Sequence, residues 1–520
     1  MSTASESTRA ALLHVCGRFL PLSETFTYDW ISGLTGFDHH VVASSVENLE
    51  HFPLANVSVP PADETGVEIA DEVNPRAIVC HFGPQATTGM PIALALNRPI
   101  VTIFHGYDIS RLLRDRVWVE RYLAVARLGM QAICISNAGR ARLLDIGWPA
   151  DQITVIRLGV DSSRFEYRPP AVRWAPAGPR RALMVARLVP KKGADVALGA
   201  MRRLQTRGSN LHLRIVGDGP ERERLERLIA EWRLFNVTLL GALEHARTRE
   251  EFADADLYIQ PSLTAESGDQ EGIPVSLMEA LASGLPAIST HHAGIPELIR
   301  HDETGLLTDE GDEEGLATAM DRVVSDANLA QRLAEAGRAH VFVDFDRDRQ
   351  MRRFAAYVDG IASNPQRRPL AHVHRGPARR PRRGLVIGSI PAAMLIRKLT
   401  LLAARHPDIE WDVIASQSAA YALVRSPLVN EVHSYPDGRL SLKQVGLERL
   451  LRLKAAPYDA AVVMFGDDSG AAHGNGRRLA REVAARHTSA LTLRDREVPL
   501  SCRGPRLRSA SPASSHVRGV

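Results

Sequence analysis

Short apolar runs alternate with helix-like segments along the first 360 residues of the chain. Between residues 11 and 156 the apolar runs are LLHVC, HVVAS, AIVC, IVTIF, AICIS and ITVI, and a second series begins at Ala182 with ALMVA, LRIVG, VTLLG, LYIQP and PAIST. Buried parallel strands read as continuous apolar runs, and strands that alternate with helices indicate βα units. The pattern predicts an α/β protein with two successive doubly wound, Rossmann-like domains, closed by helices from Glu313 to Asp359.

The last third of the chain begins with a change in composition. Residues 363–383 read SNPQRRPLAHVHRGPARRPRR, which is rich in proline and arginine and predicts a linker. Beyond it LVIGSI, EWDVIAS, EVHSY and AAVVMF again alternate with helical stretches, and the final residues are mostly arginine, serine and proline without a period. We therefore expect domains at 1–165 and 166–362, the linker at 363–383, a third, smaller α/β unit at 384–493 and a disordered tail at 494–520.

Composition narrows the class of protein only slightly. A length of 520 residues allows about three domains, and 64 basic against 60 acidic residues give a net charge of +4, which indicates no nucleic-acid partner. The four cysteines lie far apart and form no zinc or disulfide pattern, so a reducing, cytoplasmic compartment is expected. The first ten residues lack the features of a signal peptide, and the longest apolar stretches fall short of a membrane span, so secretion and membrane spanning are not expected.

The segment ESGDQEGIPVSLMEALASG, residues 266–284, carries two glutamates on different elements. Gly272 and Pro274 place Glu271 on a loop, and Glu279 follows on a helix that is otherwise apolar or small. A buried carboxylate needs polar partners, and it can accept hydrogen bonds from two hydroxyls at once, as in a ribose diol. The alternative is that Glu279 forms an ion pair with an arginine of a neighbouring element.

Basic residues follow the strand ALMV, in ARLVPKKG at residues 186–193. Arg187, Lys191 and Lys192 stand at the end of a strand where open α/β sheets bind ligands, and a diphosphate would fit there. A solvated surface loop is the alternative for such a basic loop. The nearby IVGDGP, residues 215–220, lacks the third glycine of a dinucleotide-binding fingerprint.

These residues resemble a known family, the retaining nucleotide-sugar glycosyltransferases of family 4, which have the two-domain GT-B fold. The resemblance covers about residues 11 to 360, and the motif sequences are similar to those of colanic-acid-type and exopolysaccharide transferases. It rests on the glutamate pair, the basic loop and IVGDGP, and on GVDSSRF at 159–165, HAGIPELI at 292–299, TGLL at 304–307, HFG at 81–83, HGYDIS at 105–110 and SETF at 23–26.

The resemblance implies a role for each matching residue of a hexosyltransferase site. The catalytic residues would be Arg187 and Lys192, which hold the diphosphate, Glu271, which contacts the donor sugar, and His105, which faces that sugar from the first domain. Nucleotide binding would fall to Glu279 at the ribose, with Gly217, Gly272, Ile273 and Gly17. Many relatives have paired glycines in the first loop, whereas here only Gly17 stands in CGRFLPLSETF.

The resemblance also implies the substrates and leaves other roles open. No metal and no cofactor is expected, since Glu266 and Asp269 beside Glu271 are read as solvated acids without an interleaved histidine. The donor would be a UDP-sugar or a GDP-sugar, and the acceptor a glycan or a lipid-linked glycan, with peripheral association at the inner face of the membrane as an open alternative. A soluble-sugar transferase or phosphorylase and a non-catalytic nucleotide-sugar-binding module are the rival functions. Residues 384–493 resemble the first half of a heptosyltransferase-like enzyme, as an accessory module or the remnant of a truncated transferase.

Overall fold

The computed structural model describes residues 9–21, 26–61, 66–174, 179–369, 382–424 and 426–435, together with short stretches between residues 440 and 499. The chain forms two compact units, one of residues 1–60 and 69–369 and the other of residues 61–68 and 370–520. Residues 23–25 of the SETF motif, residues 370–381 of the predicted linker, Cys502 and most of the predicted tail lie outside the described residues.

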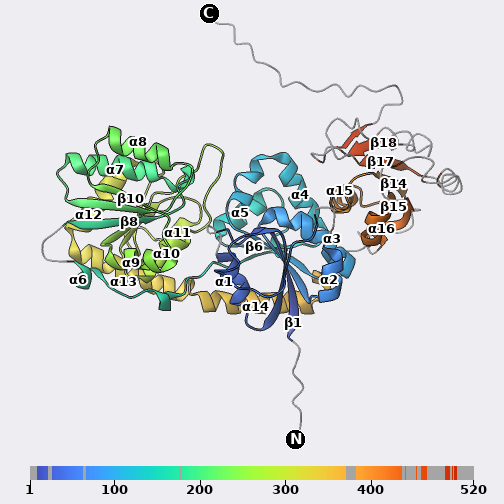
Figure 1. Cartoon of the computed structure of the whole chain (residues 1–520), viewed down its shortest axis with the longest axis horizontal. Coiled ribbons are helices and arrows are strands. Elements are labelled where there is room, and N and C mark those ends of the chain that lie inside the picture. Colours follow the sequence, from blue (N-terminus) through green and yellow to red (C-terminus); the bar gives the residue numbers. More distant parts are fainter. Residues whose placement is uncertain are drawn as a thin grey trace, which may run out of the picture. The chain divides into compact units, whose positions relative to one another are not determined.

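The first sheet, drawn in blue in Figure 1, is parallel throughout, and its strands follow the order β3-β2-β1-β4-β5-β6-β7. Each of the six apolar runs expected between residues 11 and 156 forms one of its strands. The strands are β1 (Ala10–Phe19), β2 (Phe37–Val46), β3 (Val57–Ser58), β4 (Ala77–His81), β5 (Ile100–Phe104), β6 (Gln131–Cys134) and β7 (Ile153–Val155). The connecting helices are α1 (Phe26–Ser32), α2 (Val67–Val73), α3 (Ala86–Leu96), α4 (Arg116–Arg127) and α5 (Asn137–Asp145).

The second sheet is also parallel, with the order β10-β9-β8-β11-β12-β13. Its strands are β8 (Arg180–Val185), β9 (Leu211–Val216), β10 (Val237–Gly241), β11 (Leu257–Gln260), β12 (Ala287–Thr290) and β13 (Leu306–Thr308). One face carries α7 (Ala194–Thr206), α8 (Arg222–Glu231) and α12 (Glu313–Ser325), and the other carries α9 (His245–Asp254) and α10 (Val275–Ala282) (Figure 1). Strand β13 begins within the TGLL motif and was not among the strands that the apolar pattern predicted.

The closing helices divide between the two sheets. Helix α13 (Ala327–Asp344) packs on α10, whereas α14 (Arg347–Ser363) returns to the first sheet. There the ring of Phe354 lies 4.6 Å from that of Trp30 in α1, and Arg353 donates to the carbonyl of Val155 at 3.1 Å. Between α13 and α14 the chain crosses its earlier path, where the amide of Val160 donates to Phe345 O at 2.9 Å. The second half of the first unit thus supplies a covering helix to the first half.

The beginning of the predicted linker is held against the first sheet. A short 3₁₀ turn forms at Pro365–Arg367, and Arg367 donates to Gln131 and to the carbonyl of Asp151, both at 2.9 Å. The limits at 165, 362 and 383 stay predictions.

The second unit contains a third sheet with the order β16-β15-β14-β17-β18-β19. Its strands are β14 (Arg382–Gly388), β15 (Ile409–Ser416), β16 (Val429–Tyr435), β17 (Ala460–Met464), β18 (His487–Leu491) and β19 (Glu497–Pro499), and its described helices are α15 (Ala392–Arg405) and α16 (Gln417–Val424). All described pairings are parallel except that of β18 with β19. Strand β19 falls within residues 494–520, so the prediction of a disordered tail is wrong at these three residues, where backbone pairing extends the sheet.

Within the described part of the chain, no helix is both long enough and apolar enough to span a bilayer.

Candidate functional site

Lysines and carboxylates meet at the carboxyl edge of the second sheet. The loop after β8 ends in a 3₁₀ turn, Pro190–Lys192, and the loop before α10 carries Asp269 and Glu271. Lys192 Nζ lies 3.0 Å from Glu271 Oε1, and Lys191 Nζ lies 3.1 Å from Asp269 Oδ1. Two of the four predicted catalytic residues, Lys192 and Glu271, are therefore in direct contact. The expectation that Asp269 is only solvated is wrong, because Lys191 reaches it from the neighbouring loop.

Arg187 stands on the same loop but is exposed, and its guanidinium has no ion-pair partner among the residues that the structure describes. An exposed cation beside a paired one leaves positive charge available to an anion at this edge. The geometry is compatible with the predicted diphosphate contact and does not by itself test it.

Glu271 is buried and nevertheless ionised. Burial pushes the pKa of its carboxyl up, but the charges of Lys192 and Lys191 outweigh burial and hold the pKa below its ordinary value. Its backbone N–H donates to His292 Nε2 at 3.0 Å, and His292 Nδ1 lies 2.5 Å from Glu310 Oε1. Because Nε2 accepts, Nδ1 carries the proton and donates to Glu310. The His292–Glu310 pair therefore orients the backbone of the loop that presents Glu271.

Neither His292 nor Glu310 was given a role from the sequence. His292 opens the HAGIPELI segment, so a signal was present, but its hydrogen bond to residue 271 depends on two loops meeting. Glu310, which also accepts from the backbone N–H of Thr264 at 2.7 Å, lies outside every motif and had no signal of its own.

Glu279 lies on α10 and is partly buried. Burial and then the like charge of Asp29, on α1 of the first half, raise the pKa of its carboxyl from 4.5 to about 7, and Arg249 opposes the shift. Within the described ranges it forms no ion pair, so the alternative of a structural arginine partner is not supported there. A half-protonated carboxyl at neutral pH can accept from hydroxyls or donate to them.

Two of the predicted glycines bring loops into close contact. A Cβ on Gly272 would lie 2.0 Å from the carbonyl oxygen of His105, so only glycine allows these two loops to touch. Gly217 has φ +135°, and a Cβ there would lie 1.9 Å from Ala186 O, in the loop that continues to Arg187. Ile273 is buried beside Gly272 in the core. Gly17 lies on β1 of the first sheet, where a Cβ would meet Gln85 Nε2 at 2.7 Å.

His105 follows β5, and Asp108 fixes the loop that carries it. The Asp108 carboxylate accepts from the backbone N–H of His105 at 3.1 Å, of Gly106 at 2.8 Å and of Gly83 at 2.9 Å. The rings of Phe82 and Phe26 pack on the imidazole at 4.5 and 4.9 Å. Asp108 is the fourth residue of the HGYDIS segment, and sequence reasoning missed its role because its three donors come from two separate loops.

The two halves of the first unit touch through these loops. The backbone N–H of Gln270 donates to Ser110 Oγ at 3.1 Å, and Arg114 donates to the carbonyl of Glu266 at 3.0 Å. Glu297, from HAGIPELI, accepts from the N–H of Asn137 at 2.6 Å, at the start of α5. The segments after β5 and before α10 are thereby brought together.

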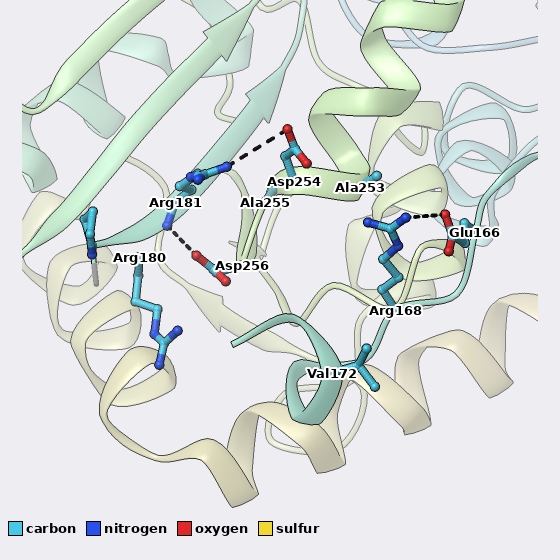
Figure 2. A pocket seen from close by; sticks show the side chains of 10 residues that line it. Glu166, Arg168, Val172, Arg180, Arg181, Ala253, Asp254, Ala255 and Asp256 are labelled. Atoms are coloured by element: carbon cyan, nitrogen blue, oxygen red, sulfur yellow. Dashed lines mark hydrogen bonds and ion pairs between the residues drawn. The ribbon is translucent and has the colours of Figure 1, made fainter. Parts of the chain in front are cut away.

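A pocket of about 480 Å³ lies elsewhere, at the amino end of the second sheet (Figure 2). Arg181, at the start of β8, donates its backbone N–H to Asp256 at 2.7 Å and lies 4.0 Å from Asp254, and Arg168 is paired with Glu166 at 2.6 Å. Open α/β sheets bind ligands at the opposite, carboxyl edge, and these charges are paired with one another. The pocket is therefore not the site of the basic loop.

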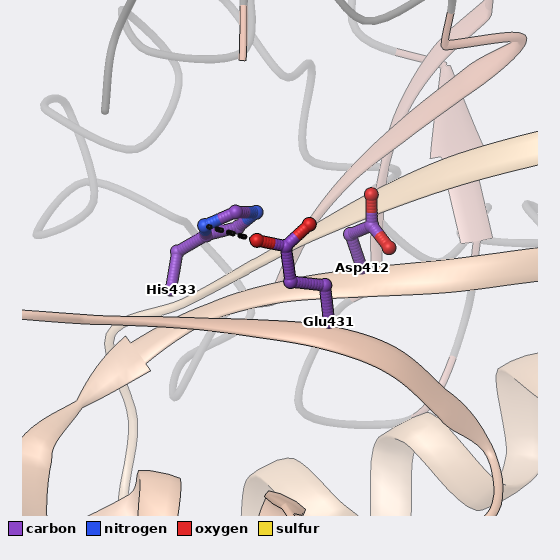
Figure 3. Close-up of side chains that lie close together, drawn as sticks. All are labelled: Asp412, Glu431 and His433. Atoms are coloured by element: carbon purple, nitrogen blue, oxygen red, sulfur yellow. Dashed lines mark ion pairs between the residues drawn. The ribbon is translucent and has the colours of Figure 1, made fainter. Parts of the chain in front are cut away.

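The third sheet brings together Asp412, Glu431 and His433, a group with the residue types of a metal site (Figure 3). The oxygens of Asp412 already accept hydrogen bonds from Arg383 at 2.5 Å, Tyr458 at 2.7 Å and Asn430 at 2.8 Å. The guanidinium of Arg383 supplies the positive charge that a buried carboxylate needs, so the group is explained without an ion.

Comparison with known proteins agrees with this arrangement of two parallel-sheet α/β halves. Residues 24–164 match the family model described as Glycosyltransferase Family 4, and residues 172–340 match the model described as Glycosyl transferases group 1. The structure of the Anabaena protein HepE in complex with UDP has 20% sequence identity, covers 67% of this chain and 100% of its own, and superposes with a TM-score of 0.59. The fold is accordingly GT-B, the class of two-domain glycosyltransferases.

The particular family follows from the sequence relatives. One relative is WcaL of Salmonella typhimurium, which is named a putative colanic acid biosynthesis glycosyltransferase. It is 36% identical over 287 residues, which are 54% of this chain and 70% of that protein. For WcaL of Escherichia coli the identity is 38% over 256 residues, or 49% of this chain and 62% of that protein. The chain belongs to the group 1, family 4 glycosyltransferases, although its match spans less than two thirds of the Escherichia coli relative.

Proposed function

We propose that the protein transfers a hexose from a nucleoside-diphosphate donor, a UDP-sugar or a GDP-sugar, to a glycan or lipid-linked glycan during polysaccharide biosynthesis. The observation that carries this proposal is the contact of Lys192 with Glu271 at 3.0 Å, beside the exposed Arg187, at the carboxyl edge of a GT-B sheet. Its relatives named for colanic acid biosynthesis support the pathway.

The charges suit the breaking of a bond between a sugar and a diphosphate. Negative charge grows on the diphosphate as that bond breaks, and the cations of Arg187 and Lys192 stabilise it without a metal ion. Glu271, ionised and held by its backbone, contacts hydroxyls of the donor sugar, while Glu279 contacts the ribose. The leaving diphosphate oxygen accepts the proton of the acceptor hydroxyl, and the configuration at the anomeric carbon is retained.

A thermal-shift panel of UDP, GDP, ADP and their sugar nucleotides identifies the donor, because a ligand at ~100 times its Kd stabilises a protein by ~2.7 kcal/mol. Hydrolysis of that donor without acceptor then tests catalysis, and NMR of the product's anomeric proton tests retention. Hydrolysis should survive EDTA. If no sugar nucleotide is bound or hydrolysed, the transferase proposal fails, and if EDTA abolishes hydrolysis and Mn²⁺ restores it, the metal-free site is wrong.

The third unit and the location are further parts of the proposal. The third unit acts as an accessory module rather than a second transferase. A cytoplasmic location agrees with Cys16, Cys80 and Cys134, which are buried and unbridged. Flotation of the protein with vesicles of anionic lipid tests peripheral membrane association.

A further inference from the structure

Four histidines lie in a diagonal row across four adjacent strands of the first sheet. They are His39 on β2, His14 on β1, His81 on β4 and His105 directly after β5. Each of the first three histidines of the row has a pairing partner on the next strand. The histidine of that next strand lies two residues after this partner. Since residues two apart point to the same face of a strand, all four share one face and step toward the carboxyl edge.

Three of these imidazoles form a continuous chain of hydrogen bonds. His39 Nε2 lies 2.9 Å from the carbonyl oxygen of Leu34, His39 Nδ1 lies 3.0 Å from His14 Nε2, and His14 Nδ1 lies 3.0 Å from His81 Nε2. A carbonyl can only accept, so His39 carries its proton on Nε2 and accepts on Nδ1. His14 therefore donates from Nε2 to His39 and accepts on Nδ1, and His81 donates from Nε2 to His14. This leaves His81 with a proton on Nε2 and a lone pair without a proton on Nδ1.

The hydrogen-bond chain ends at His81 Nδ1, an acceptor without a partner among the described residues. His81 is 1% exposed and His105 is 6% exposed, and neither His81 Nδ1 nor either ring nitrogen of His105 has a hydrogen-bond partner among the described residues. Buried polar atoms in native proteins are nearly always partnered, so such a group at a ligand-binding edge indicates a partner that arrives with a ligand. Burial lowers the pKa of both imidazoles to about 3, so this edge offers neutral groups.

We propose that the chain from Leu34 through His39 and His14 fixes the tautomer of His81, so that His81 Nδ1 accepts a hydrogen bond from a hydroxyl of the donor sugar. His81 is then a residue that contacts substrate, and His14 and His39 are positioning residues. The inference rests on the proposed transferase function, and it adds a recognition element for the sugar. A neutral acceptor suits an uncharged hydroxyl, and a site built around such a bond discriminates against a sugar that lacks the hydroxyl.

The tautomers can be measured directly in the full chain. In NMR spectra of protein labelled with ¹⁵N-histidine, with signals assigned by substitution, His39, His14 and His81 should each carry the proton on Nε2. This measurement does not depend on any activity. A proton on Nδ1 of His81 overturns the inference even if the protein proves to be a transferase.

Binding measurements test the contact with the sugar. The quantity is the affinity that the sugar adds, taken as the ratio of the Kd of UDP to that of UDP-glucose, or of GDP to GDP-mannose, whichever pair the wild-type protein binds. His81→Phe removes the acceptor and should reduce this ratio ~10-fold, while the Kd of the bare nucleotide stays within about twofold. His81→Asn keeps a carbonyl oxygen near the Nδ1 position and should preserve most of the ratio.

Substitutions at the far end of the chain separate positioning from packing. His39→Leu breaks the hydrogen-bond chain and should lower the ratio ~3-fold, whereas His39→Asn keeps a carbonyl oxygen near the Nδ1 position, offers His14 an acceptor again and should restore the ratio. His40→Leu, on the opposite face of β2, is the matched control and should change nothing. Equal losses in His39→Leu, His39→Asn and His40→Leu, or an unchanged ratio in His81→Phe, overturn the inference. A wild-type protein that binds no nucleotide at all overturns the proposed function instead.

Discussion

The carboxyl edges of the first and second sheets hold buried ionisable groups in opposite ways. At the first edge burial acts unopposed, so His81 and His105 have a pKa of about 3 and remain neutral imidazoles. At the second edge burial acts on Glu271 as well, but Lys192 and Lys191 reverse it and the carboxylate stays charged. Two similar folds thus leave the histidines of one edge uncharged and the glutamate of the other charged, and the difference lies in whether a loop lysine is within reach. The first edge suits hydroxyls and the second suits phosphates.

The largest expected effect comes from removing charge at the second edge. Lys192→Ala should lower kcat by ~10²–10³, because one electrostatic contact to a developing charge is worth ~3–4 kcal/mol. Steady-state kinetics with the identified sugar nucleotide measure it, with Arg181→Ala, at the opposite end of β8, as control. If Lys192→Ala keeps full turnover, the charged edge is not where the leaving group is stabilised.

Acid should lower the free energy of unfolding through the buried histidines of the first edge. For His81 the pKa in the folded chain, about 3, lies below the ordinary 6.5, so its contribution to stability is complete above pH 6.5 and is lost as the pH falls. Between pH 7 and pH 5 each such imidazole should remove about 2 kcal/mol from the free energy of unfolding. Urea unfolding at the two pH values should therefore show a smaller difference for His81→Phe than for wild type or His40→Leu. Parallel losses in all three proteins would mean that His81 is protonated in the folded chain.

Glu279 should respond to pH in the other direction. Its pKa in the folded protein, about 7, is raised from 4.5, so its contribution to stability is complete below pH 4.5 and is lost as the pH rises through 7. If the ionised carboxylate binds the ribose, the Kd of UDP should fall about tenfold from pH 6 to pH 8, with proton release on binding. Calorimetry in buffers of different ionisation enthalpy detects the proton. In Glu279→Gln the Kd should not depend on pH, and a slope that persists there assigns the effect to another group.

The smallest effect is expected from removing the third sheet. A chain that ends at residue 369 keeps every described residue of the first two sheets and α14, so its Kd for UDP should equal that of the full chain within about twofold. Calorimetry on both chains checks it. A folded truncated chain that no longer binds would bring the third unit into the comparison as a contributor to the site.

Much of the fold follows from the sequence because buried parallel strands leave continuous apolar runs. The positions of β1, β4, β5 and β11 were predicted in this way, and proline before α10 marked where that helix begins. Lys192 and Glu271 could be placed at one sheet edge because strand ends are visible in the sequence. Their contact at 3.0 Å required the structure.

Other features depend on register and on long-range packing, which the sequence does not display. The histidine row exists only because neighbouring strands are offset so that His14 and His81 become diagonal neighbours, and a shift by one residue would turn one of them to the other face. The return of α14 to Trp30 could not be predicted, since an amphipathic helix does not state which apolar surface it covers. Glu310 lies outside the motifs, and its sequence neighbours do not indicate its hydrogen bond to His292.

The crossing of the chain near Val160 and Phe345 has a consequence for building chimeras. An exchange of everything beyond residue 165 with a relative would also replace α14, and with it Phe354, which packs on Trp30 of the recipient's helix α1. The exchanged protein would then combine a native helix surface with a foreign covering helix. A chimera that replaces the half containing the second sheet should therefore use two junctions, one before residue 166 and one at residue 345. Helix α14 then stays with the sheet that it covers.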